Sequence, residues 1–129
     1  MIEVGMTGRA EAEVTPRRTA AAVGSGSLEV FATPCMAALM EQAAVNAVAP
    51  ALGEHESSVG TRLEITHDAA TTVGMAVWAE AQVTAVDGKR ISFTVRAGDN
   101  AGPIGAGTHE RFVITVERFM AKAQRRKEG

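Results

Sequence analysis

The chain has 129 residues, of which 46% are hydrophobic and 22% are charged, and its formal net charge is -2. Length and composition are typical of one soluble globular domain, here residues 1–129, with a core of its own. The slightly acidic balance argues against nucleic-acid binding. No apolar run approaches the roughly 18 residues that a membrane-spanning helix needs, so no membrane association is expected.

The location of the protein and the absence of cofactors follow from similar observations. The N-terminal region has no basic segment followed by an apolar one, so no signal peptide is expected. Cys35 is the one cysteine and cannot form a disulfide within the chain. A reducing compartment, the cytoplasm, is therefore predicted. No His/Cys group has metal-ligand spacing, and neither a metal nor another cofactor is expected.

The first half of the chain contains one clear helix. Residues 10–16 ("AEAEVTP") alternate in polarity and predict a strand, whereas residues 17–32 favour neither a helix nor a strand. Thr33 is a suitable N-cap, Pro34 suits the first helical position, and Pro50 ends the apolar pattern. A helix over residues 33–49 is therefore predicted.

The second half predicts four strands in a meander. The strand segments are residues 58–67, 74–86, 90–98 and 103–119, with turn residues at 87–89 and 99–102. The basic tail, residues 120–129, is expected to be a short helix or a frayed end.

The predicted helix is apolar or small on nearly every side, so other elements must cover it. A curved antiparallel sheet does this in the hot-dog fold, and an α+β hot-dog fold is predicted, with one long helix wrapped by the sheet. Such a sheet leaves one edge and one end of the helix uncovered. A second subunit is expected to close them, which predicts a homodimer.

Glu41 is the polar exception in the middle of this helix. Its helical neighbours are Ala37, Ala38, Ala44 and Val45, all small or apolar. The carboxylate lies either at the helix edge in a surface ion pair, or in a partly dry cleft, where it suits general-base or nucleophilic work. The pattern alone leaves both open.

Polar residues also mark two strands. His67 ends a strand beside a loop, a common place for catalytic groups, although a loop histidine bonded to backbone is the simpler interpretation. In "GAGTHERFVITV", His109 and Arg111 share one face of the strand. Arg111 either binds a carboxylate or phosphate, or is an ordinary exposed arginine.

The order and spacing of these motifs resemble the hot-dog acyl-CoA thioesterases related to fluoroacetyl-CoA thioesterase. The resemblance covers about residues 31–123. Thr33 and Glu41 match the helix motif of that family, and Gly60 in "SVGT" matches its following glycine. "THDAATTVG" places the family histidine at His67, and "GAGTHER" places the family arginine at Arg111.

The resemblance implies hydrolysis of an acyl-CoA thioester to the free acid and CoA, in a homodimer or a dimer of dimers. It implies Thr33, Glu41 and His67 as catalytic residues and Gly60 and Arg111 as substrate-binding residues. His67 would be the base near neutral pH. Thr33 would be the nucleophile or position a water, and Glu41 would orient His67 or attack directly.

Two geometric points accompany these roles. Eight helical residues separate Thr33 from Glu41 by roughly 12 Å, so the two side chains need a group between them, such as His67, from the same or the other subunit. Gly60 permits a close backbone approach to a thioester carbonyl, or simply marks a strand bulge. Cys35 is a rival nucleophile near the start of the helix, but the resemblance does not select it.

The loop before the helix departs from the fluoroacetyl-specific pattern. Fluoroacetyl-specific relatives have phenylalanines there that cover the acyl group, whereas Gly24 and Ser27 occupy the corresponding places here and only Phe31 remains. A short- or medium-chain acyl group is therefore expected, without selectivity for fluoroacetyl. The alternative from another class is a non-catalytic acyl-CoA-binding module or regulator with the same fold.

Overall fold

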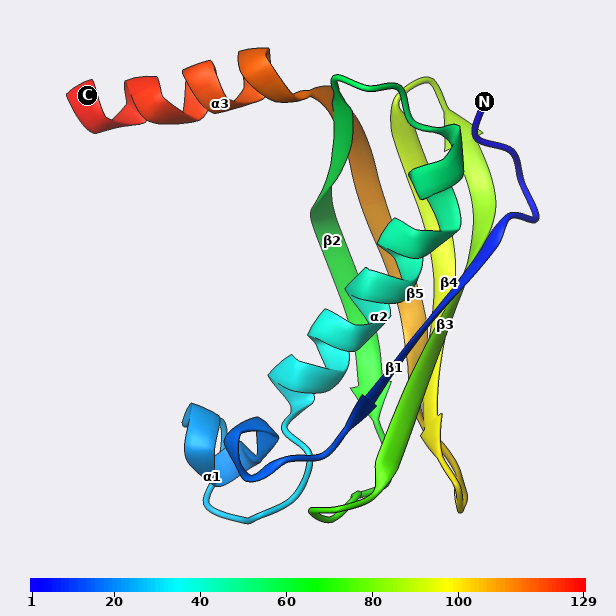
Figure 1. Ribbon diagram of the computed structural model, residues 1–129, viewed down its shortest axis with the longest axis vertical. Coiled ribbons are helices and arrows are strands. Elements are labelled where there is room, and N and C mark those ends of the chain that lie inside the picture. The colour runs from blue at the N-terminus through cyan, green and yellow to red at the C-terminus, as the bar shows by residue number, and fades with distance from the viewer.

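The computed structural model describes residues 1–129 and consists mainly of one antiparallel sheet and one long helix (Figure 1). The strands are β1 (Thr7–Glu13), β2 (Glu56–His67), β3 (Ala76–Asp87), β4 (Arg90–Asp99) and β5 (Gly102–Thr115). The helices are α1 (Ala20–Val23), α2 (Thr33–Val48) and α3 (Val116–Arg125). The five strands are ordered β1-β3-β4-β5-β2 and curl around α2, which confirms the predicted α+β hot-dog architecture.

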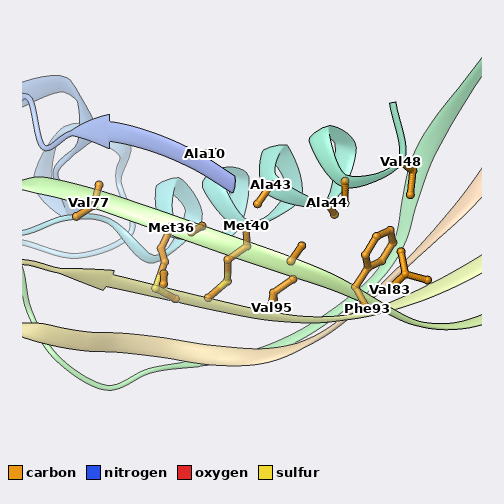
Figure 2. Packing of buried hydrophobic residues seen from close by; sticks show 14 of the residues in the cluster. Ala10, Met36, Met40, Ala43, Ala44, Val48, Val77, Val83, Phe93 and Val95 are labelled. Carbon is orange, nitrogen blue, oxygen red and sulfur yellow. The ribbon is translucent and has the colours of Figure 1, made fainter. Parts of the chain in front are cut away.

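One side of α2 forms the centre of the core. Its buried residues recur at helical spacing and are Met36, Met40, Ala43, Ala44, Ala47 and Val48. They face inward side chains of β3 and β4, among them Val77, Val83, Phe93 and Val95 (Figure 2). Because strand side chains alternate between faces, every second residue of these strands reaches the helix.

β1 packs against α2 more closely than ordinary side chains would allow. A Cβ atom added to Gly8 would lie 2.2 Å from the carbonyl oxygen of Ala43 and 2.7 Å from the Cα of Ala47. The Asn46 side chain also donates to the Arg9 carbonyl at 2.8 Å. These contacts press one side of the helix onto β1 and leave the opposite side facing β2.

The side of α2 toward β2 remains open in the single chain. Ala38 is exposed, and Ala37, Glu41 and Val45 are only partly buried. β2 is also an edge strand, since β5 is its one neighbour in the sheet. A long unpaired edge next to a partly uncovered apolar helix is typical of a surface that another chain covers.

The strand order and three boundaries differ from the sequence prediction. The predicted four-strand meander is wrong, because β2 pairs with β5 and not with β3, the next strand in the chain. β1 spans residues 7–13 and not the predicted 10–16. Ala32, and not Thr33, is the N-cap of α2, because the Thr33 hydroxyl bonds to a histidine and not to a helix N–H. β5 ends at Thr115, and the segment predicted to extend this strand begins α3 at Val116. No helix combines the length and apolar composition needed to cross a bilayer.

Candidate active site

Thr33 and His67 form a hydrogen-bonded pair at the start of α2. Thr33 is in the first turn of the helix and His67 is the last residue of β2. Thr33 Oγ1 and His67 Nδ1 are 2.7 Å apart. When Nδ1 carries no proton, the threonine hydroxyl donates to it, which is the arrangement a base needs to activate a hydroxyl.

The environment of His67 keeps its imidazole neutral. Burial lowers the pKa of His67 below its ordinary value, and the nearby Asp68 carboxylate opposes this only in part. The ring lies edge-on to Phe31, with centroids 6.5 Å apart. His67 Nε2 is buried and has no hydrogen-bond partner within the chain. An unpaired buried nitrogen is costly, so this atom is ready to bind a further polar group.

The pair opens into a pocket of about 240 Å³ between the start of α2 and the loop that precedes it. Phe31 lines this pocket and is itself buried, so it forms a floor and not a lid. Ser25 contributes from the loop, while Gly24 and Ser27 provide no bulky side chain. The pocket therefore lacks an aromatic cover from its own loop.

A larger depression of about 540 Å³ lies over β1, β3 and β4. It contains none of the candidate site residues. Its polar lining includes Glu80 and two arginines, Arg9 and Arg96, that both form ion pairs with Glu80. The smaller pocket has the unpaired imidazole nitrogen and the hydroxyl, which makes it the better candidate for chemistry.

Glu41 belongs to a second polar group further along α2. Its Oε2 accepts from Arg111 Nη1 at 3.2 Å and lies 3.9 Å from His109 Nε2. The Glu41 side chain is 42% exposed, whereas that of Arg111 is 7% exposed. The carboxylate is thus in an ion pair, as one alternative expected, but its cation is buried and not on the surface.

Arg111 is held on several sides. Its Nε donates to Ser58 Oγ at 2.8 Å and its Nη2 donates to the Ser58 carbonyl at 2.9 Å. Burial lowers the pKa of Arg111, and the Glu41 carboxylate opposes that change; a guanidinium nevertheless keeps its charge in proteins. We call Glu41, Arg111, His109 and Ser58 the Glu41 clamp. Most donors of Arg111 are used within it, so the chain directs this arginine to Glu41 and not to solvent.

Gly60 lies directly against this clamp. A Cβ atom added to it would be 2.5 Å from Glu41 Oε2 and 3.2 Å from His109 Cε1. The pairing of β2 with β5 shifts register between Gly60 and Arg62, so the glycine also marks the bulge that the sequence left open. Its missing side chain allows the carboxylate to approach the backbone of β2.

Within one chain, the structure brings Thr33 to His67 and Glu41 to Arg111 and Gly60, but His67 does not bridge the two groups. His109 was recognised in the sequence only as sharing a face with Arg111, and its contacts were missed. Strand alternation identifies inward residues but not their hydrogen bonds. Cys35 packs against the hydrophobic core, which favours the structural interpretation of this cysteine.

Comparison with known proteins identifies the family of this chain. The family model described as fluoroacetyl-CoA-specific thioesterase matches residues 14–117. The fluoroacetyl-CoA thioesterase of Streptantibioticus cattleyicolor is 48% identical over 98 residues, covering 76% of this chain and 70% of that protein.

Solved structures give the same result. The fluoroacetyl-CoA thioesterase FlK has a TM-score of 0.90 and 40% identity, with 97% of each chain covered. A thioesterase superfamily member from Thermus thermophilus has a TM-score of 0.91 and 31% identity, covering 99% of this chain and 95% of that chain. Since the family model matches most of the sequence, the chain belongs to the fluoroacetyl-CoA-specific thioesterase family of hot-dog thioester hydrolases.

Proposed function

We propose that this chain hydrolyses a short- or medium-chain acyl-CoA thioester to the free acid and CoA, with residues 1–129 acting as one hot-dog thioesterase domain. The observation that carries the proposal is the 2.7 Å contact between Thr33 Oγ1 and His67 Nδ1 at the pocket beside α2. The similarity to FlK supports the substrate class, because FlK variants have been solved with acetyl-CoA and with fluoroacetate and CoA.

His67 has the chemistry of a general base in this reaction. A neutral imidazole accepts a proton from the Thr33 hydroxyl, or from a water that this hydroxyl positions, as the oxygen attacks the thioester carbonyl. The carbon–sulfur bond then breaks, and the proton on His67 passes to the departing CoA thiolate. When a water attacks, this step gives the free acid; when Thr33 attacks, the acyl group is left on its oxygen, and a water activated by His67 then hydrolyses that ester. The backbone N–H of Gly60 of the partner subunit is the proposed donor to the carbonyl oxygen as negative charge develops there, since within one chain Gly60 lies beside Glu41 and not beside His67.

Glu41 provides a fixed negative charge in the proposed mechanism. It either orients the imidazolium that forms on His67 or attacks the carbonyl itself. In one chain, helix geometry separates it from Thr33 by roughly 12 Å, and its contacts are to Arg111 and not to His67. The carboxylate that completes a given site therefore comes from elsewhere, and a second copy of the chain can supply it.

A homodimer built through β2 would supply this carboxylate. In a two-fold dimer the edge strand pairs antiparallel with its own copy, so each residue faces a residue at the mirrored position. If this pairing is centred between Leu63 and Glu64, His67 lies opposite Gly60 of the partner subunit. Since Glu41 lies against Gly60 within each chain, the partner's Glu41 is then near His67. The same contact would cover the open side of α2. A dimer of dimers would repeat this unit.

We further propose a cytoplasmic location, which rests on the single Cys35 and its lack of an internal disulfide partner. The loop with Gly24 and Ser27 leaves the pocket without an aromatic lid, so we propose no selectivity for fluoroacetyl over other short acyl groups.

A panel of acyl-CoAs with increasing chain length tests the function. Free thiol release is measured for each, together with the melting temperature of the protein. We expect turnover for at least one short or medium acyl group, and loss of that turnover in His67→Asn with the fold retained. Thermal stabilisation by an acyl-CoA without any thiol release would instead establish the non-catalytic binding module.

A further inference from the structure

His109 is a buried histidine to which the mechanism above gives no role. It is 2% exposed and lies two residues before Arg111, on the same face of β5. Its ring stacks on that of Phe93, with the centroids 5.8 Å apart. Both ring nitrogens have partners. Nδ1 is 2.7 Å from the Arg62 carbonyl oxygen, and Nε2 is 3.1 Å from Arg111 Nη1.

These two partners determine where the ring proton lies. A carbonyl oxygen only accepts hydrogen bonds, so His109 Nδ1 must carry the proton. A guanidinium only donates, so His109 Nε2 must present its lone pair to Arg111. The structure therefore requires the neutral tautomer protonated at Nδ1. A second proton, on Nε2, would remove the lone pair that accepts from Arg111 and would place an imidazolium cation beside the guanidinium cation.

The neutral ring is consistent with its surroundings. Burial is the main cause that lowers the pKa of His109, and the Arg111 charge lowers it further. The Arg62 carbonyl and the carboxylates of Glu41 and Glu110 oppose this without reversing it. Near neutral pH, His109 thus accepts a hydrogen bond at Nε2 and donates one at Nδ1.

Arg111 Nη1 is the atom that Glu41 and His109 share. One of its protons is directed to Glu41 Oε2 and the other to His109 Nε2. Ser58 holds the far side of the guanidinium through two more hydrogen bonds. Removing the acceptor on His109 would leave a buried donor unpaired, and a buried donor turns toward any other acceptor in reach.

From this geometry we infer that His109 is a positioning residue, which holds Arg111 in the one orientation that fixes the Glu41 carboxylate against Gly60. The inference rests on the proposed function of Glu41. His109 does not touch the substrate; it acts through Arg111, and the Arg62 carbonyl sets its tautomer. Loss of this acceptor should slow the chemical step, in which Glu41 takes part, and leave substrate binding nearly unchanged.

Two variants separate positioning from packing. His109→Leu keeps an apolar side chain against Phe93 but has no acceptor, while His109→Gln retains an amide near the position of Nε2. We expect His109→Leu to lower kcat roughly ten-fold with little change in KM, and His109→Gln to stay within about three-fold of the wild type. Val113→Ala, on the same face of β5, is the matched packing control and should lower the melting temperature without changing kcat.

A double-mutant cycle provides the decisive kinetic readout. In the Glu41→Gln background, His109→Leu should cause no further loss of kcat, because the group that it positions is already gone. An equal ten-fold loss in both backgrounds would show that His109 acts through packing alone and would overturn the inference. Unchanged kcat in folded His109→Leu would overturn it as well.

A spectroscopic readout tests the inference without substrate. Nitrogen-15 NMR of histidine-labelled protein, with the His109 signals assigned by their loss in His109→Gln, should show protonated Nδ1 and unprotonated Nε2 from pH 8 to pH 6. Protonated Nε2 in this range would contradict the assigned role. If the wild type hydrolyses no acyl-CoA, the proposed function fails, and the NMR result still decides whether His109 is the acceptor for Arg111.

Discussion

The Thr33–His67 pair and the Glu41 clamp each include one residue of α2 but differ in how completely their hydrogen bonds are satisfied. The pair has one internal contact and leaves His67 Nε2 buried without a partner. In the clamp, nearly every polar atom of Arg111 and His109 has a partner: the two side chains bond to each other, Arg111 also bonds to Ser58 and Glu41, and His109 also bonds to the Arg62 carbonyl. The unsatisfied group is suited to moving protons, and the satisfied group is suited to holding a charge still.

This difference also separates what one chain completes from what it leaves incomplete. The clamp is finished within one chain, whereas the pair presents a nitrogen that still needs an acceptor or donor. A carboxylate delivered across a subunit interface would supply one. The comparison therefore predicts which variants complement one another between subunits.

The largest expected effect comes from removing either group and then mixing the variants. Glu41→Gln and His67→Asn should each lower kcat about 100-fold or more, the scale of a lost general base. If each site combines His67 of one chain with Glu41 of the other, half of the mixed dimers are heterodimers with one intact site. About a quarter of the wild-type activity should then return.

Subunit exchange is confirmed by copurification of differently tagged chains. Glu11→Gln removes an exposed carboxylate on β1 and is the matched control, with wild-type activity expected. No recovery after proven exchange would show that each site uses one chain only, and a monodisperse monomer in sedimentation would refute the shared site altogether.

A smaller effect is expected from filling the space beside the clamp. In Gly60→Ala, the new methyl group would meet Glu41 Oε2 at 2.5 Å, so the carboxylate must shift. A displacement of this kind should lower kcat roughly ten-fold. Gly53→Ala, where the nearest atom is a flexible Glu56 oxygen at 3.2 Å, should leave kcat unchanged. Wild-type kcat in a folded Gly60→Ala protein would show that the position of Glu41 is not critical.

The smallest effect is a shift in pH dependence. Burial lowers the pKa of His67 below the ordinary 6.5, so the neutral base persists to lower pH than a free histidine would. The acid limb of kcat/KM should therefore fall at a pH below 6.5. His55→Asn, which removes a surface histidine, should not move it. A limb at or above the ordinary histidine value would contradict a desolvated base.

The same shifts affect stability with a defined sign. The pKa values of His67 and His109 are both lower in the folded chain than in the unfolded one. The unfolded state therefore binds more protons below about pH 6.5, and stability falls as the pH drops through the folded pKa values. Melting temperatures should decrease from pH 7.5 to pH 5.5, and less so in His109→Gln. A melting temperature that rises toward acid pH would contradict both shifts.

The sequence was sufficient for the fold class, but not for the place of β2 in the sheet, because its strongest signal came from the helix. A single apolar helix with Pro34 near its start and Pro50 after its end, followed by alternating strands, leaves few arrangements other than a wrapped sheet. The predicted end of β5 was wrong because residues 113–116 are all β-branched, so the strand pattern continues past Thr115 without a turn residue. The helical spacing of Val116, Phe119 and Met120 begins within the same stretch.

The sequence selected candidate site residues but did not predict their contacts. Spacing and resemblance selected Thr33, Glu41, Gly60, His67 and Arg111. Spacing could not show that His67 contacts Thr33 but not Glu41 within one chain. Nor could it show that Arg111 donates hydrogen bonds to Ser58 and His109. Such contacts depend on the curl of the sheet and on the bulge at Gly60, which long-range pairing sets.

The strand order also has a consequence during translation. β3, β4 and β5 are consecutive in the chain and neighbours in the sheet, so they can pair as soon as they leave the ribosome. β2 is synthesised before them but pairs only with β5, its Glu56 opposite Thr115. At about 5–20 residues per second, β2 waits several seconds without a partner.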